Sequence, residues 1–440
     1  MEAGTGALRL ARRGAELWLP LGATALAAAT IAYGLGARAN DVQLGAGLAP
    51  FLADWRPAFR PTAIPAVVLL IAGVMAAPRL RAARLSPWQF ALAALALGLS
   101  LRLALGFAGS GVDGLYGVYE LGNHEAASEY LPALPALDFG TRFFLDTFAE
   151  VGTSLPVHAI GHPPGLLVTM HALGIDSAPA MAALTIGVGA LSIPLAYRLA
   201  RTLMDERRAR VATLLYVFAP SAVLYGATSA DALYATVALV AALPLARAAR
   251  TRKGQVATGA GALAFASFFS YANLAIGAWA TLLAWQRSGL RRATLIAGAC
   301  AAALVGFYFL LHLATGYDPI GVIEATESVY RAGIASRRPY AFWVFGSPTA
   351  FLVALGLPIA WYALRSAGAG DAPARALLAV LITAAVLGFT KAETERIYLY
   401  LVPLACLAAA ASLPEGRLSI VLGALAAQAL ATELLFYTVW

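Results

Sequence analysis

The feature that most constrains this chain is a series of long apolar runs separated by short polar segments. The runs are about 17–21 residues long, which is the length that an α-helix needs to cross a hydrocarbon core roughly 30 Å thick. Of the 440 residues, 60% are hydrophobic and only 12% are charged; the charged fraction is about half that of an ordinary soluble domain. The sequence therefore predicts an all-α, polytopic membrane protein.

The apolar runs predict about thirteen membrane spans, within a range of roughly 12–14, in a single transmembrane domain over residues 1–440. The expected spans are 16–37, 62–77, 87–107, 178–198, 211–226, 230–248, 256–272, 275–286, 292–312, 346–364, 374–390, 397–412 and 418–438. Residues 162–174 are also apolar but too few to cross in a straight helix. We expect them to form a juxtamembrane or half-inserted helix that begins at Pro163 and Pro164, with a true crossing as the alternative.

The basic residues indicate how the spans are oriented. The net charge is +8, and nearly all of the basic residues are arginines in short segments between spans, which is typical of cytoplasmic loops. The clusters are Arg9, Arg12 and Arg13; Arg79, Arg81 and Arg84; Arg201, Arg207, Arg208 and Arg210; Arg250, Arg252 and Lys253; Arg287, Arg291 and Arg292; Arg365 and Arg375. Thirteen crossings place every cluster on one side. The N-terminus is then cytoplasmic and the C-terminus external, in a bacterial plasma membrane, and no nucleic-acid partner is expected.

The same count places the polar segments 38–61, 108–177, 313–345 and 391–396 on the external face. Within the first long loop, residues 109–162 carry seven of the 23 acidic residues and only one basic residue, Arg142. Carboxylates outside the membrane can act as a general base or bind a metal. The candidate catalytic residues are Asp113, Glu120, Glu125 and Glu129. If residues 123–134 are helical, Glu125 and Glu129 share one helix face; the alternative is a solvated acidic loop.

Three further segments carry candidate binding residues. His162 lies in the sequence GHPPG, where a helix start would face an anion. Lys391 and Arg396 lie in KAETER, between two apolar runs, and suit a phosphate. Supporting residues are Glu393, Glu395, His158, Arg337 and Arg338. The alternatives are a plain helix start at GHPPG, a tight loop with snorkelling ends at KAETER, and an interfacial aromatic belt in the second external loop, 313–345.

The sequence gives no ground for a cofactor. Cys300 and Cys406 lie inside apolar runs, where we expect small core residues, and no spacing suggests a disulfide or a zinc site. No P-loop or Rossmann fingerprint is present. A metal is therefore not predicted. The first apolar run is long enough to span and lacks a small-residue cleavage site, so no cleaved signal peptide is expected.

This layout resembles the GT-C glycosyltransferases. The resemblance rests on the long loop with acids near its start, the His-Pro-Pro at its end and the following run LSIPLAYRLARTLMDERRARVATLLYVF. It covers roughly 87–250 and is nearest to the protein O-mannosyltransferase and aminoarabinose-transferase branch, whose loop holds a catalytic Asp-Glu pair. This chain lacks that pair. The segment AASEYL looks like the helix that follows the pair in that branch, and this match aligns the pair with Tyr119 and Glu120. The distance from the end of the preceding helix instead selects Asp113 as the catalytic carboxylate, and the local pattern selects Glu125.

The resemblance implies a mechanism. A carboxylate of the loop deprotonates an acceptor hydroxyl, which attacks the anomeric carbon of a polyprenyl-phosphate sugar with inversion. His162, Lys391 and Arg396 stabilise the departing phosphate. The acceptor would be a glycan, lipid or protein, and the site would be external. The alternatives are a transporter or lipid flippase, an O-antigen ligase or polymerase, and a catalytically silent scaffold.

Overall fold

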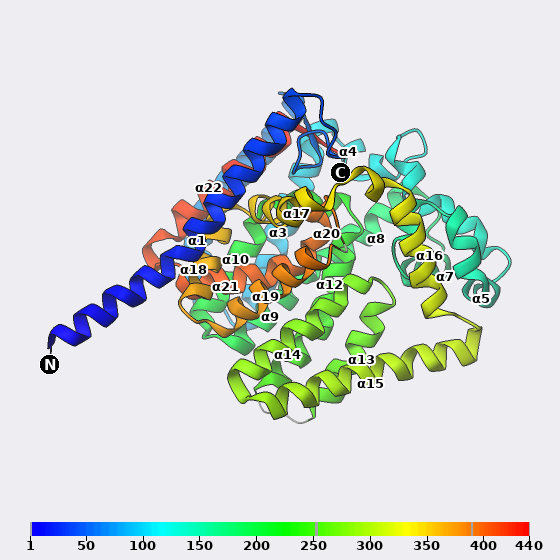
Figure 1. The fold of residues 1–440 in the computed structure, drawn as a ribbon. Helices are drawn as coiled ribbons and strands as arrows, with labels where there is room; N and C mark the ends of the chain where they lie inside the picture. The colour runs from blue at the N-terminus through cyan, green and yellow to red at the C-terminus, as the bar shows by residue number, and fades with distance from the viewer. Residues whose placement is uncertain (1, 251–253, 389, 440) are drawn as a thin grey trace. The chain divides into compact units, whose positions relative to one another are not determined.

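A computed structural model describes residues 2–250, 254–388 and 390–439, with the side chains of residues 2–15 outside the description. Arg9, Arg12, Arg13, Arg252 and Lys253 of the predicted clusters lie outside the described side chains. The described chain is helical nearly throughout (Figure 1), which confirms the all-α class. Its only strands are β1 (Ala53–Trp55) and β2 (Phe436–Thr438), which pair antiparallel with Asp54 opposite Tyr437.

Eight helices of the described chain are long and apolar enough to cross a membrane, and the count reaches ten if each of two bent pairs is one span. The eight spans are Glu16–Ala39, Pro61–Ala82, Pro87–Ser110, Ala178–Leu203, Asp231–Ala249, Leu290–Thr315, Thr394–Ser412 and Glu415–Leu435. The bent pairs are α10 (Glu206–Phe218) with α11 (Pro220–Thr228), and α17 (Tyr340–Ala354) with α18 (Leu357–Gly368). The membrane class is supported, and the predicted count of thirteen is not reproduced.

Three of the predicted spans are too short. Helices α13 (Gln255–Ser267), α14 (Leu274–Ser288) and α19 (Ala372–Leu387) have 13, 15 and 16 residues. At about 1.5 Å per residue each is roughly 20–24 Å long, less than a 30 Å hydrocarbon core. They replace the predicted spans 256–272, 275–286 and 374–390. The predicted orientation depends on those three crossings, so the side of the membrane that each loop faces stays a prediction.

The chain forms two compact units that alternate along the sequence. Unit 1 comprises the described residues up to Gly109, together with Ile193–Gly226 and Arg338–Thr438; unit 2 comprises Ser110–Ser192 and Ala227–Arg337. The assignment of residues 1–440 to one transmembrane domain stays a prediction.

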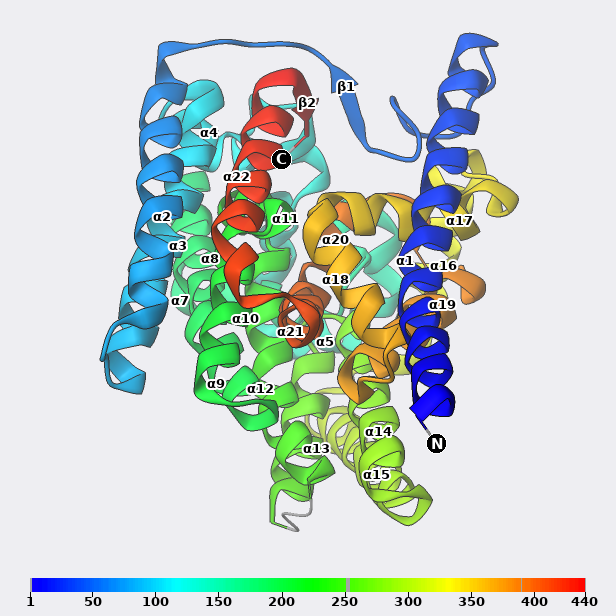
Figure 2. The same cartoon turned by 90° about the vertical axis from the view of Figure 1, so that its left-hand side faces the viewer.

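Unit 1 is a helical bundle with the β1–β2 ribbon at one end. Helix α18 packs on α1 (Glu2–Ala39) and α21 (Val402–Ser412), and α2 (Ile64–Ala82) packs on α22 (Leu418–Leu435). Figure 2 shows α1 running beside α17 and α18. The remaining elements are η1 (Pro61–Ala63), α3 (Pro87–Ser110), α9 (Ser192–Leu203), α20 (Thr394–Ile397), η8 (Tyr398–Leu401) and η9 (Glu415–Arg417).

One end of unit 1 gathers arginine-rich segments. Arg210, at the start of α10, donates hydrogen bonds to the carbonyl oxygens of Ala83 and Leu85 at 2.7 Å each, in the turn after α2. Nearby, Arg207 forms an ion pair with Glu415 at 2.8 Å. Two of the predicted clusters therefore lie at the same end of unit 1, as an orientation set by arginines requires.

The sharp turn between α17 and α18 depends on one glycine. The two helices are bent by 113°, and Gly356 at the bend has a φ of +107°. A Cβ there would overlap the Leu425 side chain and lie 3.0 Å from Pro220 Cδ. We expect Gly356→Ala to lower the free energy of unfolding by about 1–3 kcal/mol. Thermal unfolding in detergent measures this, with Gly423→Ala, whose added Cβ meets nothing within 4 Å, as control; equal melting temperatures would contradict it.

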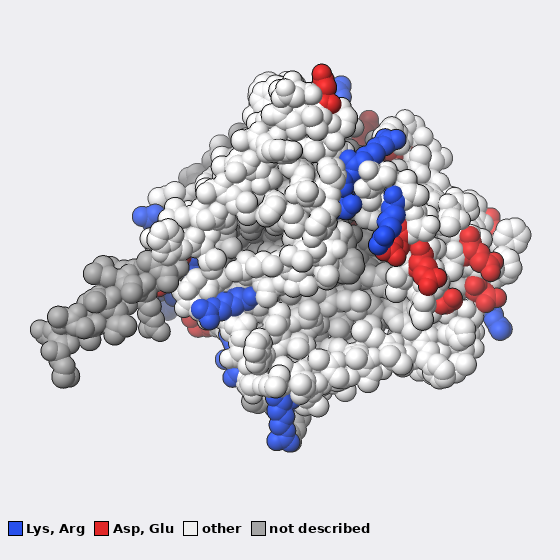
Figure 3. Space-filling view, viewed as in Figure 1, with Lys and Arg blue, Asp and Glu red and all other residues white. Residues whose placement is uncertain are grey.

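Unit 2 is built around α12 (Asp231–Ala249). Its apolar window is 83% buried, whereas that of α15 (Leu290–Thr315) is only 11% buried. Helix α12 packs on α8 (Ala178–Ala190), α13 and α14, and α15 covers α13 and α14. Figure 3 shows an uncharged surface along α15, where Val305, Phe309 and Leu310 are exposed. An apolar face of this length suits contact with lipid rather than water.

The first long loop of unit 2 consists of short helices. They are α4 (Asp113–Tyr116), η2 (Gly117–Tyr119), η3 (Glu125–Ser128), η4 (Leu131–Leu137), α5 (Thr141–Val151), η5 (Gly152–Ser154) and α6 (Val157–Ile160). Residues 123–134 are therefore not one helix, and Glu125 and Glu129 do not share a helix face. Pro132 lies in this stretch and Pro135 directly follows it, and neither can donate the backbone hydrogen bond of a continuous helix.

Two further segments complete unit 2. Helix α7 (Gly165–Leu173) begins directly after Pro163 and Pro164, as predicted, and ends at the left-handed Gly174. Its nine residues span about 14 Å, so α7 alone does not cross a membrane, and its juxtamembrane position stays a prediction. The predicted second external loop, 313–345, contains α16 (Pro319–Ala332) and η7 (Ile334–Arg337). The short helix η6 (Tyr271–Asn273) lies between α13 and α14.

Candidate functional site

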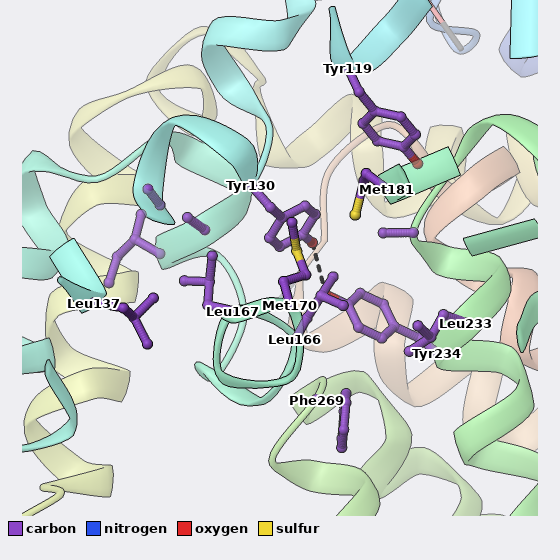
Figure 4. Close-up of a cluster of buried hydrophobic side chains, with 14 of the residues drawn as sticks. Tyr119, Tyr130, Leu137, Leu166, Leu167, Met170, Met181, Leu233, Tyr234 and Phe269 are labelled. Carbon is purple, nitrogen blue, oxygen red and sulfur yellow. Dashed lines mark hydrogen bonds between the residues drawn. The ribbon is translucent and has the colours of Figure 1, made fainter. Parts of the chain in front are cut away.

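The loop of unit 2 rests on a buried aromatic core, shown in Figure 4. The loop contributes Tyr119, Tyr130, Leu137, Phe144 and Phe148; α7 contributes Leu166, Leu167 and Met170; α8 contributes Met181; α12 contributes Leu233 and Tyr234; and Phe269 follows α13. Side chains from so many elements fix the loop by burying apolar surface. The 110–162 segment is therefore a folded part of unit 2 rather than a fully solvated loop.

Two tyrosines at the centre of this core hold the loop to α12. Tyr234, in the first turn of α12, donates a hydrogen bond of 2.8 Å to the Tyr130 hydroxyl (Figure 4). Burial raises the pKa of Tyr130 well above its usual range, so its hydroxyl stays protonated. The ring of His162 lies 4.8 Å from the ring of Tyr234. The histidine of GHPPG is thus half-buried against the start of α12, the most deeply buried span of unit 2.

This tyrosine pair gives a stability prediction. We expect Tyr234→Phe to lower the free energy of unfolding by about 1–3 kcal/mol, because the buried Tyr130 hydroxyl loses its donor. The double variant Tyr130→Phe/Tyr234→Phe should cost less than the sum of the two single variants. Chemical denaturation measures all three, with the exposed Tyr33→Phe as control. Strictly additive losses would show that the two hydroxyls are not coupled.

The four candidate carboxylates fall into two environments. Asp113 and Glu120 are exposed, and Asp113 Oδ1 accepts a 2.9 Å hydrogen bond from the Tyr116 hydroxyl. This hydrogen bond raises the pKa of Tyr116. Glu125 and Glu129 are only 9% and 2% exposed. The first pair is accessible to a large substrate, and the second pair is withdrawn from water.

The buried pair lies beside His158. The Nε2 atom of His158 is 3.1 Å from Glu125 Oε1, and ligand atoms of Glu125, Glu129 and His158 all lie within 4.8 Å of one another. Glu129 follows η3 in extended backbone with φ −85° and ψ −174°, which turns it away from a helical spacing. The two glutamates therefore come together because the chain bends after η3, and His158 of α6 joins them. The spacing of these residues in the sequence does not predict this arrangement.

Other polar residues of the loop stay outside this group. The His124 side chain is 96% exposed and lies 4.0 Å from Glu125. Asp138, Asp146 and Glu150 are exposed, and Figure 3 shows acidic side chains gathered over α5 and α16. These residues fit a solvated face of the loop.

The glycine that ends GHPPG has a structural role that sequence reasoning missed. Gly165 donates a 2.9 Å backbone hydrogen bond to the carbonyl oxygen of Phe268, after the end of α13. A Cβ on Gly165 would collide with that carbonyl group. The close approach of two backbones needs glycine here, and it anchors the segment that carries His162.

The KAETER segment belongs to unit 1 and forms a buried arginine–glutamate cluster. Glu393 accepts hydrogen bonds from Arg338 at 2.8 Å and from Arg396 at 3.0 Å. Arg338 is 2% exposed and Arg396 is 4% exposed. Arg338 also donates to the Lys391 carbonyl oxygen at 2.7 Å. Two buried guanidinium groups thus share one carboxylate, which neutralises part of their charge.

Backbone contacts complete this cluster. Glu395 is 5% exposed and accepts a 2.8 Å hydrogen bond from the Leu52 amide. The indole of Trp343 donates to the Leu44 carbonyl oxygen at 2.9 Å. The 44–52, 338–343 and 391–396 segments therefore share one end of unit 1, as the prediction of a common face requires. Ala392 and Glu393 have φ values of +67° and +60°, a strained conformation for residues with side chains.

The predicted site residues are divided between the units. Asp113, Glu120, Glu125, Glu129, His158, His162 and Arg337 belong to unit 2, and Arg338, Lys391, Glu393, Glu395 and Arg396 belong to unit 1. Arg337 is exposed, whereas its neighbour Arg338 is buried. Cys300 and Cys406 are both buried, as expected for core residues.

The chain matches no known protein family, no curated protein and no solved structure. Its function is therefore inferred from the residues and their geometry.

Proposed function

We propose that this protein transfers a sugar from a polyprenyl-phosphate donor to an acceptor hydroxyl at the external face of a bacterial plasma membrane. The observation that carries the proposal is the folded loop of unit 2, which carries exposed carboxylates and holds His162 against the start of an apolar, membrane-length helix, α12. If α12 spans the membrane, its start lies near the bilayer surface, where the phosphate of a lipid-linked donor is found. The resemblance to GT-C glycosyltransferases supports the same reaction.

The general base is assigned to an exposed carboxylate of the loop. A base must come within hydrogen-bond distance of the hydroxyl that it deprotonates. Asp113 and Glu120 are exposed, whereas Glu129 is 2% exposed. Asp113 is the first choice, because the Tyr116 hydroxyl holds its carboxylate in place. The acceptor oxygen attacks the anomeric carbon as this carboxylate takes its proton, and the bond to the phosphate breaks.

His162 is assigned to the donor phosphate. Its ring is held against Tyr234, at the start of α12, where the lipid phosphate would lie. A positioned imidazole can donate a hydrogen bond to the departing phosphate oxygen. The roles of Lys391 and Arg396 at the phosphate stay predictions, and the burial of Arg396 against Glu393 favours a supporting role for that arginine.

The test uses the purified protein in lipid nanodiscs with a panel of labelled polyprenyl-phosphate sugars and membrane extract as acceptor. Asp113→Asn, Glu120→Gln, Glu125→Gln and Glu129→Gln are assayed beside the wild type. Transfer by the wild type, lost in Asp113→Asn or Glu120→Gln, supports the proposal. Transfer that survives all four changes would rule out the carboxylate mechanism. Movement of intact donor across a bilayer without cleavage would instead identify a flippase.

A further inference from the structure

We propose that Glu125, Glu129 and His158 bind a divalent transition-metal ion, for which Zn²⁺ is the best fit. These three residues are different from the exposed carboxylates assigned to catalysis, and the inference does not require sugar transfer. Each of the three residues offers one ligand atom, and these atoms lie within 4.8 Å of one another.

The donor set fits a first-row ion. Zinc binds imidazole nitrogen at about 2.0–2.1 Å and carboxylate oxygen at about 2.0–2.2 Å, so neighbouring ligands of a tetrahedral site lie about 3.4 Å apart. The His158 Nε2 and Glu125 Oε1 atoms are already 3.1 Å apart. Three protein ligands leave one position open. The imidazole disfavours Mg²⁺ and Ca²⁺, which take oxygen ligands.

Charge provides an independent argument. Two carboxylates that are 9% and 2% exposed are costly to bury unless a cation offsets them. A protonated His158 would offset one negative charge, whereas a divalent ion would offset both.

The ion would also have a structural effect. His158 lies 33 residues after Glu125, so the three ligands join the early part of the loop, at η3, to its later part, at α6. Binding to the folded state alone stabilises that state. We therefore expect zinc to raise the melting temperature of the protein.

The first test measures zinc in the purified, full-length protein after removal of metal with EDTA and titration with Zn²⁺ against a chelating dye. We expect one tight zinc per chain in the wild type and in Glu150→Gln, an exposed carboxylate of the same loop. Glu125→Gln, Glu129→Gln and His158→Gln should each bind at least about tenfold more weakly. A wild type that takes up no zinc, or equal affinity in all five proteins, would overturn the site.

A second test yields a new signal and does not depend on a loss of binding. His158→Cys would supply a thiolate ligand, so Co²⁺ should give a thiolate-to-cobalt charge-transfer band in this variant. The wild type should bind Co²⁺ without that band, because Cys300 and Cys406 are buried elsewhere in the chain. Co²⁺ binding to His158→Cys without the band would show that residue 158 is not a ligand. Gel filtration confirms that each variant is folded.

Discussion

Replacing Glu393 by glutamine should lower the free energy of unfolding of this protein by about 3–5 kcal/mol. Glu393 is the carboxylate that Arg338 and Arg396 share, at 2.8 and 3.0 Å. Both arginines are almost fully buried. The change therefore removes the negative charge that offsets two guanidinium groups, which water cannot solvate in its place. Breaking a buried ion pair costs more than its net contribution to stability for this reason.

The measurement is thermal and chemical unfolding of the purified protein in one detergent. Arg337→Gln is the matched control, since Arg337 is adjacent to Arg338 in sequence but exposed, and a change there should alter stability by less than about 0.5 kcal/mol. A Glu393→Gln protein as stable as the control would mean that the cluster does not hold Ala392 and Glu393 in their left-handed conformation.

The second large effect concerns turnover. Asp113→Asn should reduce the rate of sugar transfer about 10²–10⁴-fold, the range for loss of a general base. Asparagine keeps the shape of the side chain and can still accept the hydrogen bond from the Tyr116 hydroxyl, but it cannot take a proton. The affinity for the donor should change little, because the base acts on the acceptor.

The control for this variant is Asp138→Asn, the same change at an exposed position of the same loop. Its turnover should equal that of the wild type. If Asp113→Asn keeps full turnover while Glu120→Gln loses it, the base is Glu120. If both variants keep it, neither exposed carboxylate is the base.

The sequence predicted the class of fold well and the number of crossings less well. Hydropathy identifies apolar runs, but the runs at 256–272 and 374–390 end early, at Ser267 and at Leu387. In the second case the left-handed Gly388 terminates the helix. Neither the helix ends nor the 113° bend at Gly356 changes hydropathy, so a pattern of apolar residues does not reveal them.

The candidate site was predictable by composition but not by geometry. Charged residues in apolar surroundings indicate both the acidic loop and KAETER. Their contacts depend on long-range packing: His158 reaches Glu125 across 33 residues and Arg338 reaches Glu393 across 55. Tyr234 and Gly165 carry no charge, and only the fold shows that one contacts His162 and the other Phe268.

The most direct test of the central proposal is donor consumption by the wild-type protein. Purified protein in nanodiscs is mixed with each labelled polyprenyl-phosphate sugar and membrane extract, and the release of polyprenyl phosphate is followed with time. The proposal predicts that at least one donor is cleaved, at a rate proportional to protein, with its sugar recovered on the acceptor. No cleavage of any donor by folded protein would contradict it.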